Sequence, residues 1–63
     1  MEFLFVASLL ISGIEFEIYY NSKEANYRVR EIDERSGDFL SDAFLLAESD
    51  EEAVRTVAEF ATA

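Results

Sequence analysis

Residues 14–20 read IEFEIYY, and larger apolar side chains alternate with more polar ones along this stretch. The side chains at even positions form one face, and Glu15, Glu17 and Tyr19 form the other. Two-residue alternation, with β-branched and aromatic residues at the apolar positions, is typical of a half-buried antiparallel strand. Each neighbouring strand must therefore present a matching apolar face.

The chain has 63 residues and contains neither Cys nor His. A single core of this size supplies only about 3 to 5 kcal/mol of stability, so a further source of stability is expected. Disulfides and zinc, haem or iron–sulfur sites need the missing residues, so we expect no metal and no cofactor. Association with a second copy remains, and we expect a homodimer.

The charge is strongly acidic, with 14 acidic and 5 basic residues and a formal net charge of -9. Such a chain repels phosphate backbones and anionic lipid surfaces, which predicts no direct binding to nucleic acid or to a membrane. A basic protein is the partner that this charge favours. The alternative is that the acidic residues serve solubility alone.

Residues 3–14 are almost wholly apolar, but they are too few to span a bilayer, which takes roughly 20 residues. A signal peptide would need a basic segment where Glu2 stands and a small-residue cleavage site, which is missing. We therefore expect a cytoplasmic protein, of a microbe or of a host cell, rather than a secreted one.

A tight turn at Ser12-Gly13 is expected to join a strand at residues 3–11 to the strand at residues 14–20. This hairpin pairs Ile11 with Ile14. The same register sets apolar residues opposite one another: Leu9 with Phe16, Ala7 with Ile18 and Phe5 with Tyr20.

Two more strands are expected at residues 27–33 and 38–47, joined by a turn at residues 34–37. For the first we predict a register that cancels charge on the outer face, pairing Ile18 with Tyr27, Phe16 with Val29, Glu17 with Arg28 and Glu15 with Arg30. For the second we predict Arg30 with Asp42, Ile32 with Leu40, Val29 with Ala43 and Tyr27 with Leu45.

A capping box at Ser49 and Glu52 predicts the start of a helix that ends near Thr62. The helix has an apolar stripe for packing on the sheet: Ala53, Val54, Val57, Ala58, Phe60 and Ala61. The chain is thus expected to be a single α+β domain over residues 1–63. Its predicted fold is a four-stranded antiparallel meander (β-β-β-β-α) with one C-terminal helix packed on one face.

Catalysis is not expected. Without His or Cys there is no imidazole base and no thiol nucleophile, and the Glu15 and Glu17 carboxylates lack an enclosed cleft. Asp33, Asp38 and Asp42 do not have the spacing of a calcium loop, so we interpret them as solvated residues around a turn.

The face of the sheet away from the helix is predicted to be apolar enough to form an interface. Its expected members are Leu4, Val6, Leu10, Ile32, Leu40, Phe44 and Leu46. Sheet-on-sheet packing with a second copy, or contact with another protein, would cover it. The alternative is that one strand has the opposite polarity. The expected acidic surface comprises Glu15, Glu17, Glu51, Glu52 and Glu59.

Part of the chain resembles the small YegP-like domains. The matching residues are Phe16-Glu17-Ile18, Tyr27-Arg28-Val29, Gly37-Asp38, and Ser49 with Ala53 and Val57. The resemblance covers residues 16–57, and it implies three antiparallel strands, a helix and pairing into intertwined dimers. It implies no activity, and the strand at residues 3–11 has no counterpart in that family. Residues 47–58 are also similar to the strand-and-helix segment of HicB-type antitoxins, whose central motifs are missing here.

Two classes of function remain. In the first, the protein is a small acidic protein-binding module, most concretely an inhibitor that occupies a basic nucleic-acid-binding surface of a target. Phage-type anti-defence inhibitors that mimic DNA act in this way. In the second, it is a self-associating structural or regulatory domain. Added salt should weaken the first kind of binding steeply and the second very little.

Overall fold

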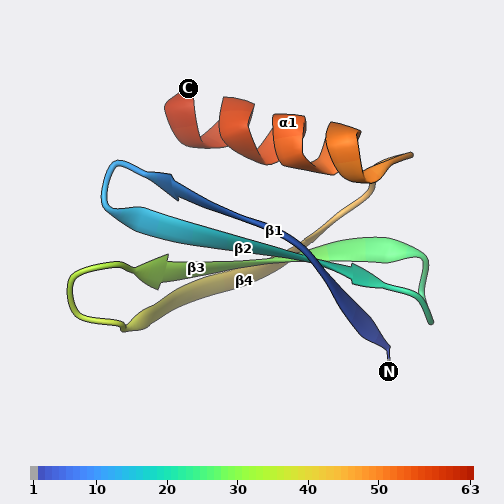
Figure 1. The fold of residues 1–63 in the computed structure, drawn as a ribbon, viewed down its shortest axis with the longest axis horizontal. Helices are drawn as coiled ribbons and strands as arrows, with labels where there is room; N and C mark the ends of the chain where they lie inside the picture. Colours follow the sequence, from blue (N-terminus) through green and yellow to red (C-terminus); the bar gives the residue numbers. More distant parts are fainter. Residues whose placement is uncertain (1) are drawn as a thin grey trace.

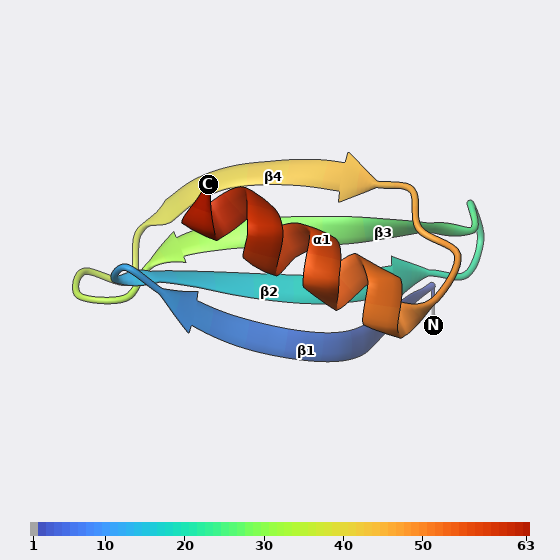
Figure 2. The ribbon, with the colours of Figure 1, turned by 90° about the horizontal axis from the view of Figure 1, so that it is seen from above.

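The computed structural model describes residues 2–63 and has four strands followed by one helix. The strands are β1 (Phe3–Ile11), β2 (Ile14–Asn21), β3 (Asn26–Asp33) and β4 (Phe39–Leu45), and the helix is α1 (Asp50–Thr62). The strands form one antiparallel sheet in the order β1-β2-β3-β4, and α1 crosses one face of it (Figures 1 and 2). The predicted α+β meander is confirmed. Within residues 2–63, no helix has the length and apolar character needed to cross a membrane.

The β1–β2 hairpin closes through a two-residue turn in which Ser12 and Gly13 both have positive φ, 53° and 79°. These angles are those of a type I′ turn, whose twist matches the twist of paired strands. Three predicted pairs are confirmed: Ile11 with Ile14, Leu9 with Phe16 and Ala7 with Ile18.

A β-bulge at Val6 changes the faces of the first half of β1. Phe5 consequently lies opposite Tyr19, and the predicted pairing with Tyr20 is wrong. Leu4 lies opposite Tyr20, whose side chain packs on the core, and Val6 also packs there. The bulge therefore moves Leu4 and Val6 from the predicted outer face to the helix face.

The β2–β3 register differs from the prediction by two residues, because the hairpin closes later along the chain than the predicted register requires, with Asn21 opposite Asn26. Ile18 pairs with Val29 rather than with Tyr27. The Asn21 side chain accepts hydrogen bonds from the amides of Lys23 and Glu24, at 3.0 and 3.2 Å. This closes a tight turn over residues 22–25. A two-residue slip leaves every side chain on its predicted face.

The β3–β4 register agrees with the prediction at three pairs: Arg30 with Asp42, Val29 with Ala43 and Tyr27 with Leu45. A second bulge, at Leu40, then places Ile32 opposite Phe39, so the predicted pair of Ile32 with Leu40 is wrong. The preceding turn is held by the Asp33 carboxylate, which accepts hydrogen bonds from the backbone amides of residues 35 and 36.

Helix α1 begins as predicted, with the Ser49 hydroxyl accepting a hydrogen bond from the Glu52 amide at 3.1 Å. The Glu52 carboxylate accepts from the amide of Glu48 at 2.8 Å, one residue before the predicted partner, Ser49. The helix packs mainly on β1 and β2. Among residues 2–63, the buried apolar core is Phe16, Ile18, Tyr27, Ala53 and Val57.

Phe60 is not part of that core, although it belongs to the predicted stripe. Its side chain is 71% exposed. Because α1 rests mainly on β1 and β2, this turn of the helix is left beside an open groove on the side of β4.

Candidate protein-interaction surfaces

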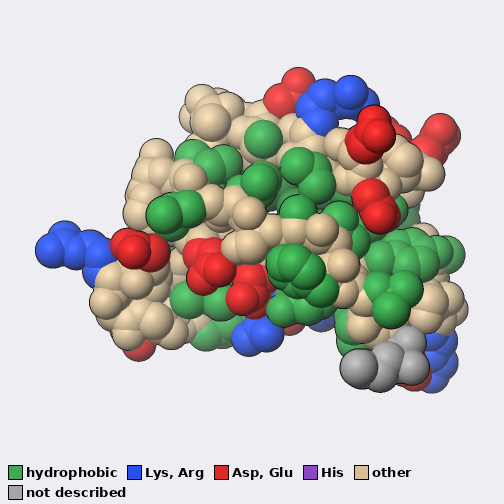
Figure 3. Space-filling view, in the orientation of Figure 1, with side chains coloured by type: hydrophobic (Ala, Val, Ile, Leu, Met, Phe, Trp, Pro, Cys, Tyr) green, Lys and Arg blue, Asp and Glu red, His purple; other side chains and the backbone are tan. Residues whose placement is uncertain are grey.

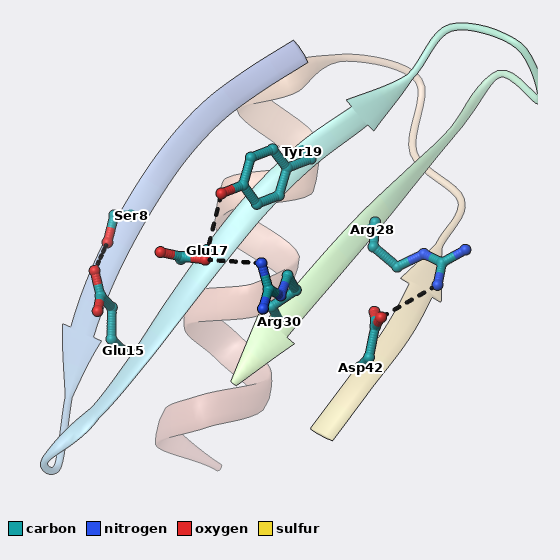
Figure 4. A network of polar contacts seen from close by, with 7 residues as sticks. All are labelled: Ser8, Glu15, Glu17, Tyr19, Arg28, Arg30 and Asp42. Atoms are coloured by element: carbon teal, nitrogen blue, oxygen red, sulfur yellow. Dashed lines mark hydrogen bonds and ion pairs between the residues drawn. The ribbon is translucent and has the colours of Figure 1, made fainter. Parts of the chain in front are cut away.

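The centre of the outer face of the sheet, the face away from α1, is polar (Figure 4). An Arg30 guanidinium nitrogen lies 3.8 Å from the Glu17 carboxylate, which also accepts a hydrogen bond from the Tyr19 hydroxyl at 3.3 Å. Arg28 donates to the Asp42 carboxylate at 3.3 Å. The charge of each arginine is thus neutralised by a carboxylate on a neighbouring strand.

These ion pairs differ from the predicted ones because of the two-residue register shift. Glu17, and not Glu15, faces Arg30. Glu15 lies between Leu10 and Ile32, and its carboxylate accepts a hydrogen bond from the Ser8 hydroxyl at 2.8 Å. Both predicted ion pairs, Glu17 with Arg28 and Glu15 with Arg30, are therefore wrong, although each arginine has a carboxylate partner on this face.

Aromatic rings complete the surroundings of the two arginines. The guanidinium carbon of Arg28 lies 5.9 Å from the centre of the Phe44 ring, and that of Arg30 lies 5.5 Å from the centre of the Phe39 ring. Each cation therefore has a carboxylate and an aromatic face as partners. Both arginines are already occupied, which makes them poor ligands for phosphate.

Apolar side chains flank this polar centre on both sides. Toward β4, Phe44 is 70% exposed, and Ile32 is half-buried opposite Phe39. Toward β1, Leu10 is 62% exposed, and Phe5 stacks edge-on against Tyr19 with ring centres 5.7 Å apart. The predicted apolar residues Leu10, Ile32 and Phe44 thus lie at the two margins of the face rather than in one continuous patch.

The other predicted interface residues lie elsewhere. Leu4 and Val6 are on the helix face, as described above. Leu40 is the bulged residue of β4, and Leu46, which is 78% exposed, follows the end of that strand. The outer face is therefore more polar than predicted. Sequence reasoning did not place Phe3, Phe5 and Phe39 at an exposed surface, because two bulges decide their positions.

The predicted acidic surface is divided between the two sides of the sheet. Glu15 and Glu17 lie on the outer face, and the other three acids lie on α1. Of those three, Glu52 is engaged at the helix start, while Glu51 and Glu59 are exposed to solvent. These acids form two separate groups and not one patch.

An apolar groove lies between α1 and β4 on the helix face. It has a volume of about 210 Å³, and its lining includes Val29, Ala43 and Leu45 from the sheet and Val57 and Phe60 from the helix. Its one charged lining residue is an acid of β3, Glu31, whose carboxylate accepts a hydrogen bond from the hydroxyl of Ser41 at 2.7 Å.

The Tyr27 side chain links the core to the start of the helix. It is 3% exposed, and its hydroxyl donates to the Asp50 carboxylate at 2.6 Å. That hydrogen bond, with burial and the negative charge of Asp50, raises the pKa of Tyr27 to about 12. A phenol that stays protonated beside a solvated acid serves to hold the helix on the sheet, and it offers no acid–base chemistry near neutral pH.

The described part of the chain contains no cluster of three or more His, Cys, Asp or Glu residues that could hold a metal ion. Comparisons with models of known protein families, with curated proteins and with solved structures gave no match. The resemblance to YegP-like domains thus stays a prediction, and the functional argument rests on the surface of this molecule.

Proposed function

We propose that this protein is a non-enzymatic binding module whose acidic surface engages a basic surface of a partner protein. The observation that supports this is the excess of uncompensated negative charge. Of the five basic residues, Lys23, Arg28 and Arg30 are already in ion pairs within residues 2–63. Eleven of the fourteen acids have no ion pair among these residues, whereas only two of the basic residues, Arg35 and Arg55, have none.

The most concrete form of the proposal is an inhibitor, acting in the cytoplasm, that occupies the nucleic-acid-binding surface of its target. A surface that binds nucleic acid is rich in Lys and Arg, and it attracts any dense array of negative charge. Carboxylates on both faces of a domain of 32 × 24 × 15 Å supply negative charge without bases or phosphates. Long-range attraction of this kind speeds association and weakens as salt is added.

Competition tests the proposal more directly than binding alone. Partners would be captured at low salt on the immobilised protein, identified and purified. Each would then be titrated with a fluorescent duplex DNA or single-stranded RNA, with and without this protein. We expect the protein to displace the oligonucleotide, and the displacement to weaken steeply between 50 and 200 mM salt. Over this range, the affinity of a protein that makes roughly 6 to 10 phosphate contacts falls by about 10³- to 10⁵-fold.

Two exposed acids of the helix provide a matched pair of variants. Glu51→Gln with Glu59→Gln removes two charges, whereas Glu51→Asp with Glu59→Asp keeps them. We expect the Gln variant to inhibit less than the Asp variant. A target that binds the protein and its nucleic acid at the same time, or inhibition that is indifferent to salt, would contradict the proposal.

A further inference from the structure

Strand β1 is an edge of the sheet that has no charged side chains. It lies at one end of the strand order, and none of its nine residues is charged, in a chain of which 30% is charged. An edge strand carries unpaired backbone N–H and C=O groups that can pair with another strand, and proteins usually guard such edges with charged side chains. The opposite edge, β4, carries Asp42 near its middle.

The register shows which backbone groups of β1 face outward. In a two-residue hairpin the closing pair, here Ile11 and Ile14, exchanges both hydrogen bonds, and hydrogen-bonded pairs then recur at every second residue. Leu9 therefore bonds to β2, while Ser8 and Leu10 direct their N–H and C=O groups away from the sheet. The bulge at Val6 interrupts this alternation, so residues 7–11 form the regular part of the edge.

Several apolar side chains of this edge are exposed. Figures 1 and 3 look onto it, and Figure 3 shows hydrophobic side chains across the middle of this side of the molecule, with acidic side chains among them. Four large apolar residues of β1 are substantially exposed, at 42 to 62%: Phe3, Leu4, Phe5 and Leu10.

We propose that β1 pairs antiparallel with β1 of a second copy across a two-fold axis, joining the two four-stranded sheets into one. Antiparallel pairing of a strand with itself gives the self-complementary contact that a closed dimer requires. Because β1 has no charge, no register brings like charges together within the strand pair. Pairing through β4 would instead bring the two copies of Asp42 close to one another.

The absence of charge also argues against a foreign basic strand as the occupant. A protein of charge -9 attracts basic partners through its carboxylates, and β1 contributes none. The self-interface leaves Glu51 and Glu59 outside the strand pair. The inference is independent of the proposed function and stands or falls on the mass in solution.

Sedimentation equilibrium of the wild-type chain and of two matched variants tests the proposal. Leu10→Glu places a charge on β1, and Leu40→Glu makes the same change on the other edge strand at a comparably exposed position. We expect a dimer for the wild type and for Leu40→Glu, and a monomer for Leu10→Glu. A monomeric wild type at millimolar concentration, or loss of the dimer in Leu40→Glu alone, would overturn the proposal.

Leu10→Glu also faces Glu15 and could lose stability for that reason, so a backbone variant is needed. Leu10→Pro removes an N–H that points away from β2 and so leaves the β1–β2 ladder intact. We expect this variant to keep its circular dichroism spectrum and to be monomeric. A folded Leu10→Pro variant that remains dimeric would refute pairing through this edge.

Amide hydrogen exchange tests the same strand pairing in the wild-type protein, without any substitution. In the dimer the amides of Ser8 and Leu10 are hydrogen-bonded across the two-fold axis, so their exchange should slow at high protein concentration and quicken on dilution. Added salt should strengthen the dimer or leave it unchanged, since screening reduces repulsion between two copies of charge -9. Fast exchange at both amides in the dimer, or dissociation by salt, would rule this interface out.

Discussion

The positive φ of Gly13 makes it the most sensitive position of the hairpin turn. A Cβ added there would meet no atom within 4 Å, so any cost of Gly13→Ala comes from the backbone conformation. An L-residue with this conformation loses roughly 1–2 kcal/mol. We expect urea denaturation to show a loss of that size for Gly13→Ala. Ser12→Asn, which supplies the preferred Asn-Gly pair, should increase stability.

Gly37→Ala is the control, because Gly37 has a similar φ, 76°, and equally open surroundings, but lies in a different turn. The two glycine variants should lose similar amounts of stability. If Gly13→Ala cost nothing, β1 and β2 would not be joined by a type I′ turn in solution.

Tyr27 makes stability depend on pH in the alkaline range. Its pKa is 10.0 in an unfolded chain and about 12 in the folded protein, chiefly because its hydroxyl donates to Asp50. The folded state therefore favours the protonated phenol. This contribution is complete below pH 10 and is lost as the pH rises toward 12. We expect the unfolding midpoint in urea to fall across that interval.

The Tyr27→Phe variant isolates the effect. It should be less stable than the wild type below pH 10, and the fall above pH 10 should be smaller. The ultraviolet absorbance of tyrosinate supplies a second measurement, since the delayed titration of Tyr27 should disappear. A wild-type titration with no tyrosine delayed toward pH 12 would contradict the hydrogen bond to Asp50.

Helix α1 depends on its first turn, where Ser49 and Glu52 satisfy backbone amides. Loss of an N-cap hydroxyl typically costs about 1 kcal/mol. We expect Ser49→Ala to lose that much in urea denaturation. Glu52→Gln, which keeps an oxygen that can accept from the Glu48 amide, should lose less. Equal losses would mean that the charge of Glu52 stabilises this turn as much as the hydrogen bond to Ser49 does.

Elements that are set by local chemistry could be predicted from sequence. The Ser12-Gly13 turn, the alternation along β2 and the cap at Ser49 each depend on residues close in the chain, and all three are present. The β2–β3 register was missed because it depends on how tightly Asn21 closes the following turn. Two neighbouring registers that keep the same faces differ too little in side-chain pattern to be distinguished.

The candidate surface was less predictable than the fold, because the two bulges decide which side chains share a face. No glycine or other sequence signal marks a bulge at Val6, yet this bulge moves Leu4 to the helix face and Phe5 to the outer face. The exposure of Phe60 was missed for a different reason. An apolar stripe shows that a helix packs on a sheet, but it does not show which strands the helix covers.

At the scale of the whole molecule, the net charge opposes folding. Charges of one sign repel within a compact domain, and the longest dimension of this one, 32 Å, is close to the Debye length of about 30 Å at 0.01 M salt, so the acids repel one another across the whole molecule at low salt. Added salt also weakens the ion pairs, but exposed pairs such as that of Lys23 with Glu2 contribute only about 0–1 kcal/mol each. Screening of the repulsion should therefore dominate.

We thus expect the protein to become more stable as NaCl is raised from low concentration to about 1 M, where the Debye length is about 3 Å. Relief of 1 kcal/mol of repulsion would raise the Tm by about 4–8 °C in a domain of this size. The measurement should be made at two protein concentrations, because a dimer also stabilises the fold and depends on concentration. Glu59→Gln reduces the net negative charge near the C-terminal end of α1, where an acid is unfavourable, so its Tm should start higher and respond less to salt. A Tm that falls with salt at both concentrations would mean that attractive ion pairs outweigh the repulsion among the acids.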